Sequence, residues 1–144
     1  MKKLLLNIIS SMYLFISLTT SVMASDQDDA LKSSKNILTA LQKKEFEMLW
    51  DNHTSEFFKS KTTKQSFLAN LTMGRQQLGV ADKSEFVDMA YAQTDAATGY
   101  KGEIYAFNYL NTYSAGKFYE RIVVIKEKDG KFRLAGLWGS PAQK

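Results

Sequence analysis

Residues 100–138 read YKGEIYAFNYLNTYSAGKFYERIVVIKEKDGKFRLAGLW, and this stretch decides the fold. Residues 103–113 alternate between apolar and polar side chains, the SAG that follows is a tight turn, and Asp129-Gly130 is a strong hairpin signal between two further runs of strand-forming residues. Upstream, residues 84–93 are also rich in strand formers. The sequence therefore predicts a meander of four antiparallel strands.

The faces of these strands are unusual because both are apolar. Residues two apart in a strand share a face, so Tyr105, Phe107, Tyr109 and Tyr113 point one way, whereas Ile104, Ala106 and Leu110 point the other way. A sheet with helices on one side only normally has a polar outer face. We interpret the aromatic face as core, with tyrosine hydroxyls at the mouth of a pocket. We expect the other face to be covered by a partner, or by the C-terminal strand and side-chain stems.

Residues 30–79 carry apolar side chains at helical spacing and predict about three helices. The first follows a polar lead-in, residues 25–29, which we expect to be frayed, and it ends in a turn near Lys43 and Lys44. The second covers residues 45–60. The third begins at a threonine cap and stops at Gly79, with Gly74 allowing close packing. Helices followed by a meander predict one α+β domain, residues 25–144, in which the helices pack on a curved four-stranded sheet as a cone-like roll.

The N-terminus has the pattern of a secretory signal peptide. Lys2 and Lys3 precede an apolar, uncharged run, and Val22-Met23-Ala24 supplies the residues that a signal peptidase recognises. We predict a signal peptide over residues 1–24 and no stable membrane anchor after cleavage, because polar residues dilute the run below the length that a membrane span needs. The expected location is the bacterial envelope, as a periplasmic or secreted protein.

Composition excludes several classes of function. The 144-residue chain has no cysteine and one histidine, so cysteine nucleophiles, cysteine metal sites and multi-histidine metal sites are ruled out, and no metal or cofactor is expected. Without the signal peptide, 17 basic and 15 acidic side chains remain, which predicts no nucleic-acid partner.

Several motifs in their order resemble a known family. They are Trp50, Arg75 within RQQLG at residues 75–79, Glu120, and DGKFRLAGLW at residues 129–138. In these features the chain resembles the bacterial domain-of-unknown-function 4019 family, within the nuclear transport factor 2-like (cystatin-like) superfamily of α+β rolls. Phe132 and Lys83 depart from the pattern, which would have Trp and Arg there. The resemblance implies the cone-like fold and brings no established activity.

Candidate site residues divide into two groups. Asp51, His53 and Asp88 are the candidates for acid–base catalysis, but Asp51 and His53 are two apart on a helix and do not face each other. The candidates for ligand binding are Trp50, Arg75, Tyr105, Phe107 and Tyr109. For Arg75 we favour a structural role, a clamp between helix and sheet that pairs with Glu85, Asp88 or Glu120.

We therefore favour a non-enzymatic module that binds a small apolar ligand or a protein partner, with a homodimer through the sheet as one form of partnership. The first alternative is a small isomerase-like or dehydratase-like enzyme with a site inside the cone. The second alternative is a subunit of an envelope or secretion assembly. A carboxylate or histidine deep in the pocket would distinguish the enzyme from the other two.

The signal peptide gives the first testable prediction. The exported protein should begin at Ser25, because the small residues of a cleavage site directly follow an apolar run. N-terminal sequencing of the exported form checks this, and a chain that keeps Met1 in the membrane fraction would contradict it.

Overall fold

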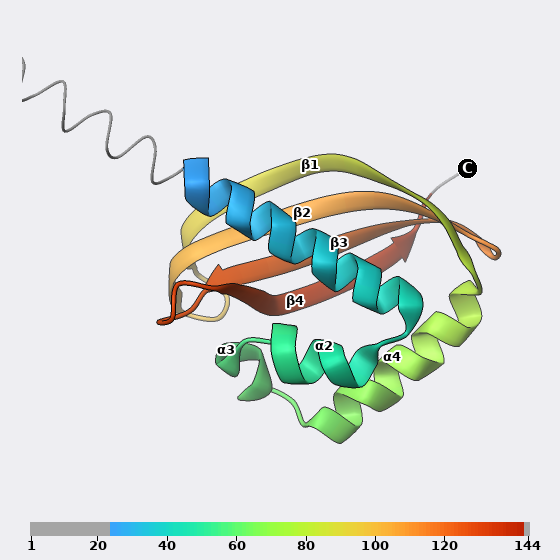
Figure 1. Cartoon of the computed structure of the whole chain (residues 1–144), viewed down its shortest axis with the longest axis horizontal. Coiled ribbons are helices and arrows are strands. Elements are labelled where there is room, and N and C mark those ends of the chain that lie inside the picture. Colours follow the sequence, from blue (N-terminus) through green and yellow to red (C-terminus); the bar gives the residue numbers. More distant parts are fainter. Residues whose placement is uncertain (1–23, 143–144) are drawn as a thin grey trace, which may run out of the picture.

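The computed structural model describes residues 24–142, which form helices first and then a sheet. The helices cover residues 24–43, α2 (Phe46–His53), α3 (Glu56–Lys59) and α4 (Lys64–Leu78). The strands are β1 (Ala81–Asp95), β2 (Tyr100–Tyr113), β3 (Gly116–Lys126) and β4 (Phe132–Pro141). The strands pair antiparallel in the order β1-β2-β3-β4, so the predicted α+β meander is confirmed (Figure 1). The described part of the chain has four helices, where about three were predicted.

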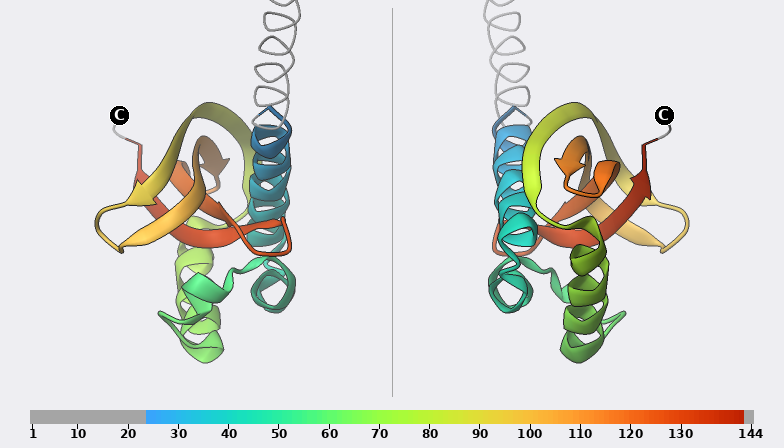
Figure 2. Two further views of the ribbon diagram at one scale, coloured as in Figure 1. Left: turned by 90° about the vertical axis from the view of Figure 1, so that its left-hand side faces the viewer. Right: turned by 90° about the vertical axis from the view of Figure 1, so that its right-hand side faces the viewer.

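The sheet is open and strongly curved. The pairing of β1 with β2 is irregular at three places, between Ala81 and Lys83, between Phe86 and Asp88, and between Ala92 and Thr94. Irregularities of this kind bend a strand and raise its twist, and on an edge strand they discourage pairing with another chain. The side views show the resulting curl, with the N-terminal helix lying on one side of the sheet (Figure 2).

The N-terminal helix holds its place through both its apolar face and an ion pair. Ala30, Ile37 and Leu41 are fully buried at helical spacing. Near the start of the helix, the Asp26 carboxylate lies 2.7 Å from the ammonium group of Lys126 on β3. The expectation of a frayed lead-in at residues 25–29 is therefore wrong. The predicted signal peptide falls almost wholly on residues 1–23, outside the described residues. No helix in the described part of the chain is long and apolar enough to cross a membrane.

The predicted single helix over residues 45–60 is instead two helices, because the sheet interrupts it. Thr54 has an extended backbone (φ −101°, ψ 132°) and forms a parallel bridge with Leu134 on β4. The next amide, that of Ser55, donates to the Leu134 carbonyl at 2.9 Å. The predicted turn at Lys44 is confirmed, with φ 61°.

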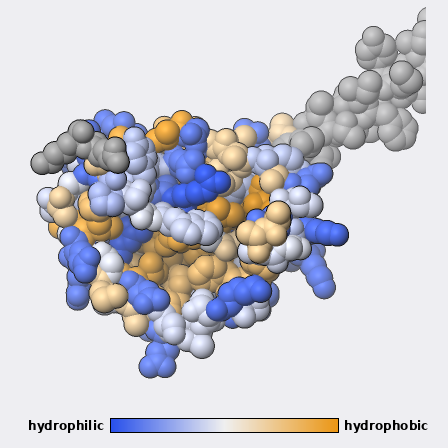
Figure 3. Space-filling model, turned by 180° about the vertical axis from the view of Figure 1, so that it is seen from behind, coloured by the Kyte–Doolittle hydropathy of each residue, from blue (hydrophilic) through white to orange (hydrophobic). Residues whose placement is uncertain are grey.

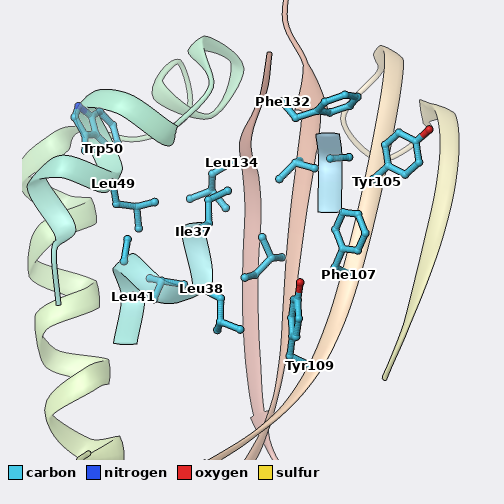
Figure 4. Packing of buried hydrophobic residues seen from close by; sticks show 14 of the residues in the cluster. Ile37, Leu38, Leu41, Leu49, Trp50, Tyr105, Phe107, Tyr109, Phe132 and Leu134 are labelled. Atoms are coloured by element: carbon cyan, nitrogen blue, oxygen red, sulfur yellow. The ribbon is translucent and has the colours of Figure 1, made fainter. Parts of the chain in front are cut away.

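The aromatic face of β2 is the core, as expected. Tyr105, Phe107 and Tyr109 are at most 3 % exposed and pack with Ile122, Val124 and Leu134 beneath the helices (Figure 4). The Tyr109 hydroxyl is satisfied inside the core by a hydrogen bond of 2.5 Å with the Ser34 hydroxyl. A buried hydroxyl without such a partner would cost stability.

Helix α4 begins and ends as predicted. The Thr63 side chain caps it by accepting from the Ser66 amide at 3.2 Å, and Gly79 ends it with φ 78°. A side chain at Gly79 would meet Ser114 on the β2–β3 turn, so close approach adds to the need for glycine. The proposed close packing at Gly74 is wrong, because no atom beyond its own stretch of helix lies within 4 Å of where its Cβ would be.

Arg75 clamps α4 to the sheet, and of its three candidate partners it pairs with Glu120. The Glu120 carboxylate accepts hydrogen bonds from Arg75, from Asn111 and from the Tyr113 hydroxyl, and Arg75 also donates to the Tyr113 oxygen at 2.6 Å. Both charged side chains are almost completely buried. Burial, and then the hydrogen bond to Glu120, raise the pKa of Tyr113 far above its usual range. The hydroxyl therefore remains a donor to the carboxylate at physiological pH.

Trp50 yields a prediction of stability. Its ring lies 5.2 Å from that of Phe67, centroid to centroid, and joins α2 to α4 in the core. Trp50→Ala should lower the free energy of unfolding by about 3–5 kcal/mol, because it leaves a cavity. Urea denaturation measures this. Met73→Ala on the exposed side of α4 is the control, with an expected change within about 0.5 kcal/mol. Equal midpoints for the wild type and Trp50→Ala would contradict the burial.

The Arg75–Glu120 pair yields a second prediction. Arg75→Met should cost about 3–5 kcal/mol, because it leaves a buried carboxylate without its cation. Adding Glu120→Gln should recover part of that loss, giving a coupling energy of about 0.5–3 kcal/mol in a double-mutant cycle. The matched control is the exposed Lys64–Asp51 pair, whose coupling should not exceed about 1 kcal/mol. Strictly additive losses at Arg75 and Glu120 would show that the clamp does not exist.

Candidate functional site

The sheet face opposite the helices is built from rows of small and aliphatic side chains. Across the middle of the sheet, Ala90 pairs with Ala106, Ala106 with Val123, and Val123 with Gly136. In the next row, Ala92 pairs with Ile104, and Ile104 with Ile125. Directly paired residues share a face, so these rows lie side by side. Because Ala90 and Ala106 have small side chains, the middle row leaves a hollow there.

This hollow, which we call the trough, has the floor residues Ala90, Ala92, Ile104, Ala106, Val123 and Ile125. Its volume is about 670 Å³. Seen from behind the sheet, the middle of this face is apolar and is surrounded by hydrophilic side chains (Figure 3). Ala106 and Ile125 are nearly buried although they belong to the side away from the helical core, so other side chains must cover them.

Helix α3 supplies one wall of the trough. The Ser55 hydroxyl, which caps α3 by accepting from the Phe58 amide, donates to the Leu134 carbonyl at 2.7 Å. This anchors the four-residue helix at the β4 edge, where Phe57 and Phe58 line the trough. The Phe57 ring packs edge-to-face on Tyr100, with centroids 5.1 Å apart. The break at Thr54 therefore has a consequence for the site, because it brings α3 around the edge of the sheet.

Trp138 on β4 forms another wall, and Gly136 makes room for it. A Cβ built on Gly136 would lie only 2.3 Å from the Trp138 ring, so the indole lies over the glycine and any side chain there would displace it. Trp138 nevertheless remains 59 % exposed. An aromatic ring that is held in place but open to solvent is a contact surface that costs little entropy to use.

The row of paired residues that contains Trp138 is otherwise polar. Asp88, Asn108, Arg121 and Trp138 pair in that order across the sheet. Asn108 donates to the Asp88 carboxylate, and its carbonyl accepts from Arg121 at 3.5 Å. This row borders a second hollow of about 430 Å³, the adjoining pocket, which contains Asp88, Asn108, Tyr119, Arg121, Trp138 and Ser140. The trough and the adjoining pocket share Arg121 and Trp138.

The predicted ligand-binding residues lie on the other side of the sheet. Tyr105, Phe107, Tyr109 and Trp50 are buried in the core with the helices, and Arg75 is engaged with Glu120. None of the five is among the residues that line the trough or the adjoining pocket.

The three candidates for catalysis are not brought together. Asp51 is exposed and pairs with Lys64 at 2.9 Å. His53 is half-buried in a surface hollow with Lys131 and Arg133, where burial, and then the charge of Arg133, lower its pKa. Asp88 lies on β1 in the adjoining pocket. Among residues 24–142, no cluster of three histidine, cysteine or acidic side chains could hold a metal ion.

The residues that shape the trough were missed by the sequence analysis, although one signal was available. Ala90 and Ala92 alternate on β1, a pattern that leaves one face of an exposed strand without bulk. Pairing of Ala90 with Ala106 and of Val123 with Gly136 depends on strand register, and the irregularity between Val123 and Val124 shifts that register. The sequence did not indicate this shift.

Comparison with known proteins supports the fold and the family. A solved structure of a protein from Catenulispora acidiphila is similar, with a TM-score of 0.52 and 15 % sequence identity over 82 % of this chain and 92 % of that one. This likeness concerns the fold alone. The search of curated proteins found no match. Residues 33–137 match the family model described as "Protein of unknown function (DUF4019)". Because this match covers most of the chain, the protein belongs to the DUF4019 family.

Proposed function

We propose that this protein is a non-enzymatic binding module that holds a small apolar molecule in the trough. The observation that carries the proposal is the pair Ala90 and Ala106 in the middle row, whose small side chains leave a hollow in an apolar face. A volume of about 670 Å³ is typical of sites for small molecules, which are concave and lined mainly by apolar and aromatic side chains.

The titratable groups around the trough favour binding over acid–base catalysis. The carboxylate that lines it, that of Asp95, accepts hydrogen bonds from the Thr98 hydroxyl and the Ala97 amide, which lower its pKa. Burial raises the pKa of Tyr100, and the hydrogen bond with Glu103 raises that of Tyr91. General acid–base catalysis works best with a group that titrates near the operating pH, and these shifts move all three groups away from it.

A protein partner is the second candidate, favoured by a different observation. Val87, Tyr119 and Trp138 are each about half exposed and meet at the adjoining pocket. Apolar surface that gathers in this way is typical of contact sites. A second copy of the chain, or another subunit of an envelope assembly, would cover these residues. It would also close the trough to a small molecule.

Location and wider ancestry also belong to the proposal. We place the module in the bacterial envelope or outside the cell, as the signal-like residues 1–24 suggest. We also assign it to the nuclear transport factor 2-like superfamily. The order of helices before a curved antiparallel meander supports this assignment.

Filling the trough tests the proposal. The neutral dye N-phenylnaphthylamine, whose fluorescence rises in apolar surroundings, should bind the wild type with a saturable signal. Ala90→Phe should weaken binding at least about tenfold, because the ring would occupy the floor; tenfold corresponds to about 1.4 kcal/mol. Ala90 is exposed on the edge strand, so the variant should keep its fold, which circular dichroism checks.

The matched control is Gln93→Phe, which adds a comparable ring to the same strand at an exposed position that does not line the trough. It should bind the dye as the wild type does. Equal affinity in all three proteins, or no saturable binding in any of them, would overturn the proposal. If sedimentation shows a dimer that excludes the dye, the protein-partner candidate is correct instead.

A further inference from the structure

The trough and the adjoining pocket form one continuous site with two chemical halves. Arg121 and Trp138 line both hollows and stand at the boundary between them. On the trough side, the neighbouring rows offer Ala90, Ala106 and Val123. On the other side lie Asp88, Asn108 and Ser140. A ligand that spans this boundary must have an apolar part and a polar part.

The length of the apolar half suits a hydrocarbon chain. Arg121 and Ile125 are four residues apart on β3, or about 13 Å at about 3.3 Å per residue. Phe57 and Tyr100 pack together at the end remote from Arg121, where Lys61 and Asp95 also line the trough. The floor between these ends carries no charged side chain. The trough is therefore better suited to an extended hydrocarbon chain than to a compact ring system.

The charge at the boundary favours an anion. Of the two acidic residues that line the adjoining pocket, Asp88 is bonded to the Asn108 amide and Glu120 to Arg75, Asn111 and Tyr113. Arg121 is exposed, and its one side-chain hydrogen bond among the described residues is the 3.5 Å contact with Asn108. It forms no ion pair with any carboxylate in residues 24–142. A guanidinium group presents five donors in a planar fork that matches a carboxylate, so most of its bonding capacity is available at this point.

The amide of Asn108 separates the two charges of the row. It directs its N–H group to Asp88 and its carbonyl to Arg121, and the two charged residues stand on strands that are not neighbours. An anion beside Arg121 would therefore lie nearer to the guanidinium than to the carboxylate. Trp138, fixed over Gly136, would cover the first part of the chain next to the headgroup.

We propose that the ligand is a single-chain amphiphile whose hydrocarbon chain fills the trough and whose carboxylate or similar anionic headgroup pairs with Arg121. This inference rests on the proposed function, because it names the ligand class of the same site. The amphiphile is bound as a free molecule and not within a bilayer. The walls made by Phe57 and Trp138 require the chain to leave the lipid and lie along the sheet.

Calorimetric titration with three soluble probes of equal chain length tests the inference: decanoate, decanol and decyltrimethylammonium, each below the concentration at which it forms micelles. Decanoate should bind up to about fivefold more tightly than decanol, because an exposed ion pair contributes at most about 1 kcal/mol, which corresponds to about fivefold in affinity. The cationic probe should bind most weakly. Salt should reduce the preference for decanoate, since the headgroup site is exposed.

Arg121→Gln should remove the preference for decanoate over decanol. The matched control is Lys117→Gln, which removes an exposed positive charge from the same strand outside both hollows and should keep the preference. If decanoate and decanol bind equally and Arg121→Gln changes neither, the headgroup assignment is wrong although the apolar site remains. If no probe binds, the proposed function itself fails. Binding to anionic vesicles without binding of soluble decanoate would show that the surface takes a bilayer and would also overturn the inference.

Discussion

The structure depends on one constraint: a sheet with two apolar faces has helices enough to cover only one. Tyr105, Phe107 and Tyr109 give β2 a heavy aromatic face, and the N-terminal helix with α2 and α4 buries it. Burial of one large side chain contributes about 1.5–3 kcal/mol, so the helices settle on the face with the most area to bury. The remaining face has small side chains in its middle, and its large exposed apolar residues Val87, Tyr119 and Trp138 gather at one end.

The small side chains in the middle of the open face explain several features of the structure. Alanines and a glycine in the middle row expose little apolar area, so the face can meet water at modest cost. The same small residues leave the hollow that larger ones would fill. The irregular pairing of β1 bends the sheet around this hollow and makes the edge a poor template for another strand. The small side chains that limit the apolar area exposed to water therefore also leave space for a ligand.

Sequence reasoning could predict the elements that depend on local pattern. Alternation in residues 103–113 and the Asp129-Gly130 turn predicted the meander, and Thr63 and Gly79 marked both ends of α4. It failed where a distant contact overrides the local pattern. The helical pattern of residues 45–60 continues through Thr54, and only a bridge to Leu134, 80 positions later, breaks it. The lead-in at residues 25–29 looked free because its partner, Lys126, is 100 positions away from Asp26.

The predicted ligand-binding residues lie in the core, opposite the trough, for a related reason. Aromatic residues attract attention as ligand contacts, but aromatic residues are also what a core needs, and alternation alone does not say which face the helices will choose. The partner of Arg75 could be limited to three acidic residues, and the structure shows it to be Glu120. The end of α4 meets the β2–β3 turn, where the Ala115 amide donates to the Leu78 carbonyl. The roles of Gly136 and Trp138 become visible only in the structure, where the Trp138 ring lies over the glycine.

Two neighbouring residues on β3 show why a charge is available at the open face and not in the core. Glu120 points to the helices and Arg121 to the open side. In the core, an unpaired charge would cost several kcal/mol, so Glu120 is bonded to Arg75, Asn111 and Tyr113 at once. On the open face, water can solvate Arg121, and no such pressure exists to neutralise it. Because an unpaired charge is costly in the low dielectric of the core, the polar groups there are bonded to one another. A side chain that recognises a ligand by its charge therefore lies at the surface, where water can solvate it while it is unpaired. In this fold that place is the boundary row, beside the hollow that the small residues leave.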